Sequence, residues 1–100
     1  MVKLVALFKK PADAASFDEH YESVHIPLVS KMPGMKKIEI SKVTGAPMST
    51  PQFYRMAEMY FDDQAALNKA IMSPEGMAAA KDLMGFAKDV VQMFFAEVSE

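Results

Sequence analysis

Three short segments of this chain are apolar on both of the faces that a β-strand presents. In residues 2–8, for example, Leu4 and Ala6 alternate with Val5 and Leu7, so neither side of the predicted strand is polar. An antiparallel sheet with one face in water shows alternating apolar and polar residues instead. The predicted sheet must therefore be covered on both faces, and this requirement limits the folds that the chain can adopt.

The predicted elements follow one another in the order strand, helix, strand, strand, helix, strand. The strands are expected at residues 2–8, 35–44, 53–61 and 90–98, and the helices at residues 13–30, 62–72 and 73–86. This is the order of the ferredoxin-like βαββαβ fold of the α+β class, in which one four-stranded antiparallel sheet carries the helices on a single face. One domain over residues 1–100 accounts for the chain.

The second face of such a sheet stays bare, because the chain has no further element to cover it. A large exposed apolar face implies a partner. The simplest partner is a second copy of the chain, packed sheet on sheet about a two-fold axis. We therefore expect a homodimer that forms through the sheet face.

Composition excludes several classes of function. The net charge of −2 and the pI of about 5.6 give no electrostatic reason to expect nucleic acid or an anionic membrane as a partner. Without cysteine there is no disulfide, no thiol nucleophile and no thiolate metal site. The apolar run at the start of the chain is too short to span a membrane and has no small-residue cleavage signal. We expect a cytoplasmic protein.

The candidate site lies in residues 17–28, where His20, Tyr21 and His25 precede Pro27. Tyr21 and His25 are four residues apart and share a helix face. Pro27 has no N–H, and its ring clashes with the Ser23 carbonyl, so the helix must bend or restart there. An imidazole titrates near neutral pH, which makes His25 a candidate acid/base. The alternative is a half-buried packing residue.

The two neighbours of His25 in this motif have separate expectations. Tyr21 can orient His25 or donate to a developing oxyanion; alternatively, its ring packs on the sheet with the hydroxyl at the rim. His20 lies about 140° around a regular helix from His25, so it is expected to face solvent. For the same reason, the two histidines do not share a metal ion, and no metal site is expected.

The third strand contains one carboxylate among apolar and aromatic residues. A buried carboxylate needs a partner, so Glu58 is expected to pair with His25, with Arg55 from a neighbouring surface, or with a backbone partner across the sheet. The alternative places Glu58 at the open edge of the sheet, in water. Three neighbouring residues can line a pocket for an aromatic substrate, or can simply be part of the core: Tyr54, Met56 and Tyr60.

Three motifs together resemble the EthD family. They are the string Phe-x-x-His-Tyr-x-x-x-His-x-Pro-Leu of residues 17–28, the aromatic strand of residues 53–61, and Ser73-Pro-Glu-Gly76. The resemblance covers essentially the whole chain. It implies a dimeric α+β barrel, in which two ferredoxin-like subunits join their sheets. That group includes cofactor-free oxygenases, isomerases, polyketide cyclases and haem-degrading enzymes, so the family does not settle the reaction.

Together these observations predict a small homodimeric enzyme that acts on a hydrophobic, aromatic or polyketide-like molecule. The chemistry is expected to be of the acid/base or oxygenase type and to need no bound cofactor. His25 would act as acid/base with Tyr21 and Glu58 as helpers. One alternative is a non-catalytic ligand-binding or accessory dimer for a catabolic enzyme. Another is a haem-handling barrel with His25 as the axial ligand.

Overall fold

The two central strands of the sheet are the first and the third in the chain. In the computed structural model, which describes residues 1–99, β1 (Val2–Phe8) lies between β3 (Arg55–Phe61) and β4 (Val91–Glu97). The strand β2 (Lys37–Lys42) pairs with the outer side of β3, and all three pairings are antiparallel. The sheet order β2-β3-β1-β4 confirms the predicted ferredoxin-like α+β fold.

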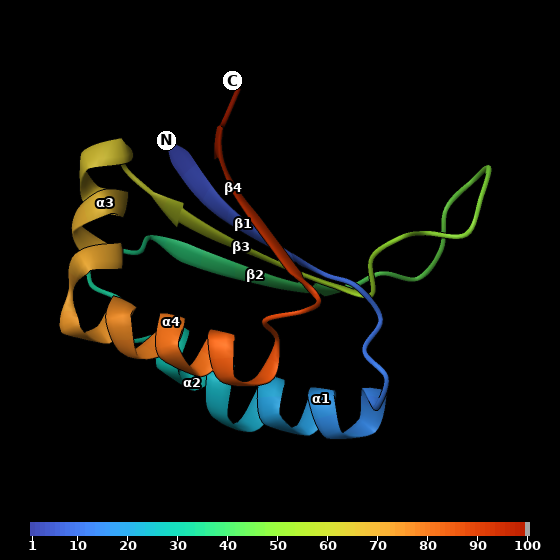
Figure 1. Cartoon of the computed structure of the whole chain (residues 1–100). Coiled ribbons are helices and arrows are strands. Elements are labelled where there is room, and N and C mark those ends of the chain that lie inside the picture. Colours follow the sequence, from blue (N-terminus) through green and yellow to red (C-terminus); the bar gives the residue numbers. More distant parts are fainter. Residues whose placement is uncertain (100) are drawn as a thin grey trace.

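All the helices cover one face of the sheet (Figure 1). The helix α1 (Ala14–His20) leads into a π-turn, η1 (Tyr21–His25), and then into α2 (Ile26–Val29). After β3, α3 (Gln64–Met72) and α4 (Pro74–Phe86) follow, and α4 packs beside η1 and α2. The N-caps are those that side-chain chemistry favours, each worth about 1 kcal/mol: Asp13 for α1, Asp63 for α3 and Ser73 for α4.

The helix predicted over residues 13–30 is divided by the π-turn. Pro27 cannot donate a backbone hydrogen bond, and the Ile26 N–H bonds to the Tyr21 carbonyl, five residues earlier, instead of to the one four residues earlier. Such a turn inserts one extra residue into the helix. The predicted disturbance is confirmed, and it lies on the N-terminal side of Pro27.

The close joint between α3 and α4 depends on a glycine. Ser73 ends α3 and caps α4, and its hydroxyl donates to the Ala70 carbonyl while accepting from the Gly76 N–H. A Cβ on Gly76 would lie 2.1 Å from the Ala70 carbonyl oxygen, so no other residue fits without moving the helices apart. Within residues 1–99, no helix is long and apolar enough to cross a membrane.

The pairing register decides which strand residues face the helices. Leu4 is opposite Met59 and Phe95, and Ala6 is opposite Ala57 and Met93, so these residues share the helix-facing side. The side chains of Leu4, Ala6, Ala57 and Met59 join those of the helices in the core, whereas Met93 and Phe95 on β4 remain exposed. The largest fully buried members of that core are Phe8, Tyr21, Phe61 and Leu67. Burying one such side chain stabilises the fold by about 1.5–3 kcal/mol.

The other face of the sheet is open in the single chain, and it is only partly apolar. We call its apolar centre the open-face patch; it consists of Leu7, Met56 and Phe94 together with Val5, which is already buried beneath its neighbours. Beside this patch, Lys3 Nζ donates to Glu58 at 2.6 Å and the Tyr60 hydroxyl donates to Glu39 at 2.6 Å. The expectation that this face is apolar throughout is therefore corrected: alternate residues of β3 and β2 give it a polar margin.

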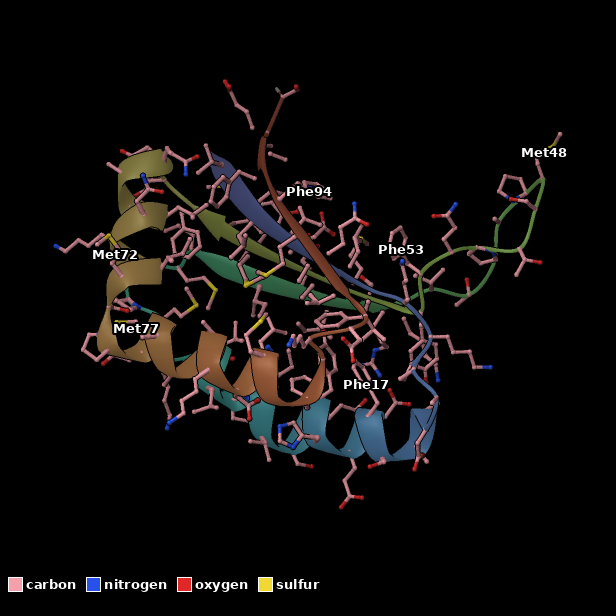
Figure 2. The ribbon with its side chains drawn as sticks, viewed as in Figure 1. Phe17, Met48, Phe53, Met72, Met77 and Phe94 are labelled. Carbon is pink, nitrogen blue, oxygen red and sulfur yellow. The ribbon has the colours of Figure 1, made fainter. Side chains whose placement is uncertain are left out.

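The connection between β2 and β3 leaves the body of the molecule as a long loop. Its tip carries Met48, which is 93% exposed and points away from the rest of the chain (Figure 2). The loop lies at the opposite end from the α3–α4 joint, so it does not border the space between the sheet and the helices.

Candidate active site

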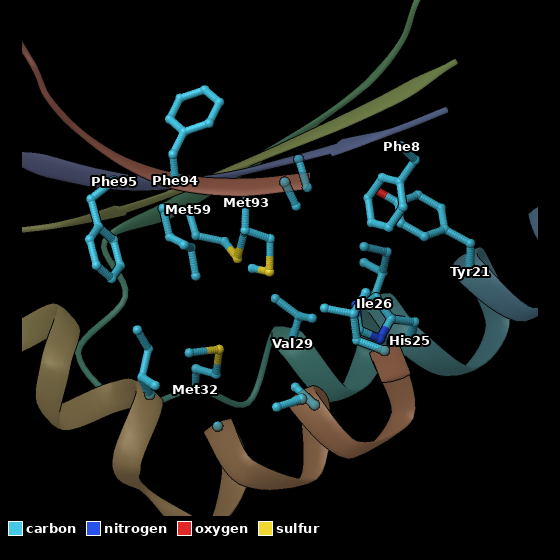
Figure 3. Close-up of a pocket in the computed structure, with 18 residues that line it drawn as sticks. Phe8, Tyr21, His25, Ile26, Val29, Met32, Met59, Met93, Phe94 and Phe95 are labelled. Carbon is cyan, nitrogen blue, oxygen red and sulfur yellow. The ribbon is translucent and has the colours of Figure 1, made fainter. Parts of the chain in front are cut away.

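A cavity of about 310 Å³ lies between the helix-facing side of the sheet and the helices (Figure 3). Its volume is at the lower end of the range for small-molecule pockets, about 300–1,000 Å³. The side chains of Met59 and Met93 reach into it from the sheet, and Val29 and Met32 reach into it from below. The Phe94 ring points away, as its register with Val5 requires.

Among the described residues that line this cavity, only Tyr21 and His25 have titratable side chains. The rest of the wall is apolar. It includes Leu4, Ala6, Phe8, Ile26, Ala57, Ile71, Ala79 and Leu83. A ligand in this space would therefore lose its water and meet two polar groups at one end.

His25 ends the π-turn and is 5% exposed. Its Nδ1 lies 3.0 Å from Oδ2 of Asp82, a residue of α4. A carboxylate only accepts hydrogen bonds, so this contact assigns the ring proton to Nδ1. The lone pair of Nε2 is then the site that a ligand proton can approach.

Burial lowers the pKa of the His25 imidazole, because the charged ring loses its hydration inside the protein. The hydrogen bond and the negative charge of Asp82 act against this effect, and the nearby His20 adds to it. The net direction is downward, so His25 is neutral at pH 7. A neutral, oriented imidazole in an apolar cavity is able to act as a general base.

His20 is partly exposed, as the sequence predicted, but its ring also binds a carboxylate, which the prediction did not include. Its Nε2 lies 2.9 Å from Oδ1 of Asp82, and its side chain is 36% exposed. The prediction assumed a regular helix, in which residues five apart point in different directions. The π-turn places them nearly one above the other, so both imidazoles reach the same carboxylate. The Phe86 ring packs against both, at centroid distances of 4.5 Å and 5.0 Å.

Tyr21 is fully buried, and its hydroxyl has no hydrogen-bond partner among the described residues. Its ring stacks on Phe17 at 5.6 Å and lies 6.1 Å from the His25 ring, nearly parallel to it. Burial raises the pKa of the Tyr21 hydroxyl to about 12, so the group keeps its proton and is a potential donor. A buried donor without a partner costs about 1–3 kcal/mol, which a ligand acceptor would recover.

A charged cluster under the first helix holds the Tyr21 ring in place. The Arg55 guanidinium lies 4.7 Å from the centre of that ring. It also pairs with Asp18 at 3.0 Å and with Glu22 at 3.3 Å. The Tyr54 hydroxyl donates to Asp18 at 2.5 Å. Tyr54 thus fastens α1 to the sheet; it does not line the cavity.

The structure does not bring the other predicted site residues to His25. Glu58, Met56 and Tyr60 point to the open face, because they alternate along β3 with Ala57 and the other cavity-facing residues. The predicted pairing of Glu58 with His25 or Arg55 is wrong, since Glu58 pairs with Lys3. A one-residue difference along a strand changes the face, and the sequence pattern did not say which face would be covered.

Asp82 and the role of His20 were missed by sequence reasoning. A signal for Asp82 exists in α4: Ala79, Asp82, Leu83 and Phe86 have the spacing of one inward-facing helix stripe. Asp82 is the one polar residue in that stripe, which marks it as a side chain with a buried partner. The partner itself lies 57 residues away and cannot be read from local spacing.

Within residues 1–99, the structure assembles no group of three or more histidine, cysteine, aspartate or glutamate side chains suited to holding a metal ion. His20, Asp82 and His25 form hydrogen-bonded pairs, with the carboxylate between the two rings.

Fold and site together define a ferredoxin-like α+β domain with an apolar cavity between sheet and helices and a buried His–Asp pair. The chain belongs to the EthD family, whose EthD domain matches residues 9–89. This confirms the family predicted from the three motifs. An uncharacterized 11.0 kDa protein from the thcB-thcC intergenic region of Rhodococcus erythropolis is 38% identical over 97% of this chain and 94% of its own length.

Solved structures agree with this assignment. An ethyl tert-butyl ether D (EthD) family protein from Bacillus halodurans is 41% identical, covers 99% of both chains and superposes with a TM-score of 0.95. SnoaB, a cofactor-independent oxygenase from Streptomyces nogalater, is 14% identical over 99% of this chain and 93% of its own, with a TM-score of 0.71, and shares the fold. A dimeric protein of unknown function from Bacteroides fragilis is 22% identical over 97% and 95%, with a TM-score of 0.66.

The lowered pKa of His25 predicts a pH-dependent stability. The unfolded chain binds a proton at this ring near its ordinary pKa of about 6.5, whereas the folded protein does so only at lower pH. The contribution of the neutral ring to the free energy of unfolding is therefore complete above the pKa that His25 has in the unfolded chain. It is lost as the pH falls through the pKa that His25 has in the folded protein. Urea unfolding between about pH 7.5 and pH 5.5 should show a declining free energy, with a weaker decline in His25→Gln. Equal slopes would contradict the burial of a neutral ring.

Proposed function

We propose that this protein is a small homodimeric enzyme that moves a proton on a hydrophobic, aromatic or polyketide-like molecule, without a bound cofactor. The observation that carries the proposal is the position of His25. It is a neutral imidazole at the end of an apolar cavity, with Nδ1 held by a carboxylate. This arrangement is that of an oriented general base.

The proposed step begins at His25 Nε2, which takes a proton from an acidic C–H next to a carbonyl or from a phenol. The electron pair of the broken bond stays on the ligand as an enolate or phenolate. The imidazolium that forms is stabilised by Asp82 through the Nδ1–H, 3.0 Å from the carboxylate. The Tyr21 hydroxyl is the group that would donate to the new oxyanion.

The fate of the anion decides the overall reaction. If the imidazolium returns the proton to another carbon, the result is an isomerisation; if the carbanion attacks a carbonyl within the same molecule, it is a cyclisation. The same fold supports cofactor-independent oxygenase chemistry in the Streptomyces nogalater protein, so reaction of the anion with dioxygen is compatible with it. All three begin with the deprotonation assigned to His25.

A second candidate is a binding protein that holds such a molecule for a catabolic enzyme. The observation in its favour is the almost wholly apolar wall of the cavity, which suits retention of a ligand as well as its conversion. The two candidates differ in what happens when His25 is replaced: a binding protein loses affinity, and an enzyme loses rate.

The homodimer is proposed to form through the open-face patch. Phe94 is 44% exposed on this face, next to Val5 and in line with Leu7 and Met56. A second copy placed on this face would cover the apolar centre, and its own polar margin would meet the Lys3–Glu58 and Tyr60–Glu39 pairs. The dimeric relative from Bacteroides fragilis, which has the same fold, supports this assembly.

Replacement of Phe94 by Asp is expected to dissociate the dimer, because it puts a charge into the centre of the interface. Light scattering over a dilution series measures the effect. Met48→Asp is the matched control, since its side chain lies at the tip of the projecting loop. A wild-type chain that is monomeric and melts cooperatively at low concentration would rule out the dimer.

His25→Ala is expected to slow proton removal by about 10²–10⁴-fold, the usual loss for a general base. β-Tetralone is a suitable probe, because it is an apolar bicyclic ketone with an acidic C–H next to its carbonyl. Its exchange of hydrogen for deuterium in heavy water is followed by NMR, with and without protein. The assay does not depend on knowing the complete reaction.

His25→Gln is the control for shape, because the amide can hydrogen-bond but does not titrate near neutral pH. If both variants exchange as fast as the wild type and differ only in affinity for the ketone, the enzyme proposal fails and the binding protein is correct. An absorption band of bound haem that is lost in His25→Ala would instead support the haem-handling alternative.

Tyr21→Phe is expected to separate stability from activity. In the empty protein the hydroxyl is buried without a partner, so its removal should leave the free energy of unfolding unchanged or raise it by up to about 1–3 kcal/mol. Ketone exchange should nevertheless slow, because the oxyanion loses its donor. Urea unfolding and the exchange assay measure the two effects. A destabilised variant with full activity would show that Tyr21 is a packing residue.

A further inference from the structure

One carboxylate stands between the two histidines of the chain. His20 Nε2 lies 2.9 Å from Oδ1 of Asp82 and 3.1 Å from its Oδ2, and Oδ2 lies 3.0 Å from His25 Nδ1. The side-chain exposure falls from 36% at His20 to 17% at Asp82 and 7% at His25. The three side chains thus form a continuous hydrogen-bonded row from the surface to the cavity.

The surface end of this row opens into a groove. Its lining includes His20, Asp82, Lys81 and Phe86, none of which lines the cavity. The His20 end of the row is therefore open to water, while His25 lies in an apolar space. The two rings bind the same carboxylate but differ in their exposure to water.

A particular distortion of the backbone creates this arrangement. In a regular helix, residues five apart differ by about 140° in direction. The π-turn removes most of this difference and brings both rings over Asp82. Isolated π-turns are rare and are found frequently at functional sites. The Phe86 ring closes the cluster by packing on both imidazoles.

We propose that His20 is a positioning residue for His25: by binding the second oxygen of Asp82, it fixes the carboxylate and shares its negative charge between two imidazoles. The inference rests on the proposed role of His25 as the base. It adds a residue, and a shift in the pH dependence of the reaction, that the base alone would not have.

The physical consequence is that the two imidazoles compete for the negative charge of Asp82. Because the carboxylate also binds His20, it stabilises a positive charge on His25 less than it would alone. The direction of this effect agrees with that of His20 on the pKa of His25, which is downward. The base then stays unprotonated, and so available, at mildly acidic pH.

Few other charged groups face the two rings. From α4 these are Asp82 itself and Lys81 in the groove. On the π-turn, the neighbour of His25 in the cavity wall is Tyr21, which keeps its proton. From β3, Arg55 packs on Tyr21 and is paired with Asp18 and Glu22. The shared carboxylate is therefore the main link between the two histidines.

The test is an NMR titration of the histidine ring signals in the full-length protein, which needs no substrate. The chain has two histidines, so each replacement of His20 leaves a single ring to follow. In His20→Gln, which retains a hydrogen-bond donor, and in His20→Phe, which does not, the pKa of His25 should rise. In Asp82→Asn it should fall, because both contributions of the carboxylate disappear.

Activity should follow the same shift. In the β-tetralone exchange assay, the acid limb of the pH profile should move to higher pH in His20→Gln, with the rate at its plateau largely retained. A merely structural role for His20 would lower the rate at every pH and leave the profile where it is.

Lys81→Gln is the matched control, because it removes a positive charge from the same groove without a bond to Asp82. The proposal is overturned if His25 titrates identically in the wild type and both His20 variants. It is also overturned if Lys81→Gln shifts His25 as much as His20→Gln does. A titration shift without ketone exchange would leave the coupling intact and remove only the proposed reaction.

Discussion

The missing N–H of Pro27 is the constraint on which the site depends. It interrupts the helical hydrogen bonding, and a π-turn from Tyr21 to His25 forms directly before it. That turn places His20 and His25 over Asp82 and leaves Tyr21 facing the cavity. Without the extra residue in the turn, one histidine would point elsewhere and the carboxylate would serve a single ring.

Two features of the site lower the stability of the fold. The Tyr21 hydroxyl is buried without a partner, and His25 is buried as a neutral ring whose pKa is lowered. The unpaired hydroxyl opposes folding, and the lowered pKa of His25 does so as the pH falls below the ordinary pKa of the ring. The Arg55 cluster acts against these effects locally, since it binds α1 through Asp18 and Glu22 and packs its guanidinium on the Tyr21 ring.

Family membership accounts for the fold, whereas the chemistry depends on the residues of the site. A chain 41% identical and a chain 14% identical both superpose on this one over almost its full length. Such a fold fixes a sheet, a layer of helices and the space between them. The chemistry then depends on the content of that space, which in this protein is an apolar wall with one oriented imidazole and one unpartnered hydroxyl at the same end.

The sequence by itself determined the order of strands and helices, the fold class and the break near Pro27, and it pointed to His25 and Tyr21 as candidate site residues. These features follow from local periodicity and from the chemistry of single residues, which act over a few positions. The tertiary structure decided which face of β3 the helices cover, and so removed Glu58 from the site and paired it with Lys3. It also joined His25 to Asp82, 57 residues away. Such contacts depend on how α4 packs against the π-turn, and no local pattern records that packing.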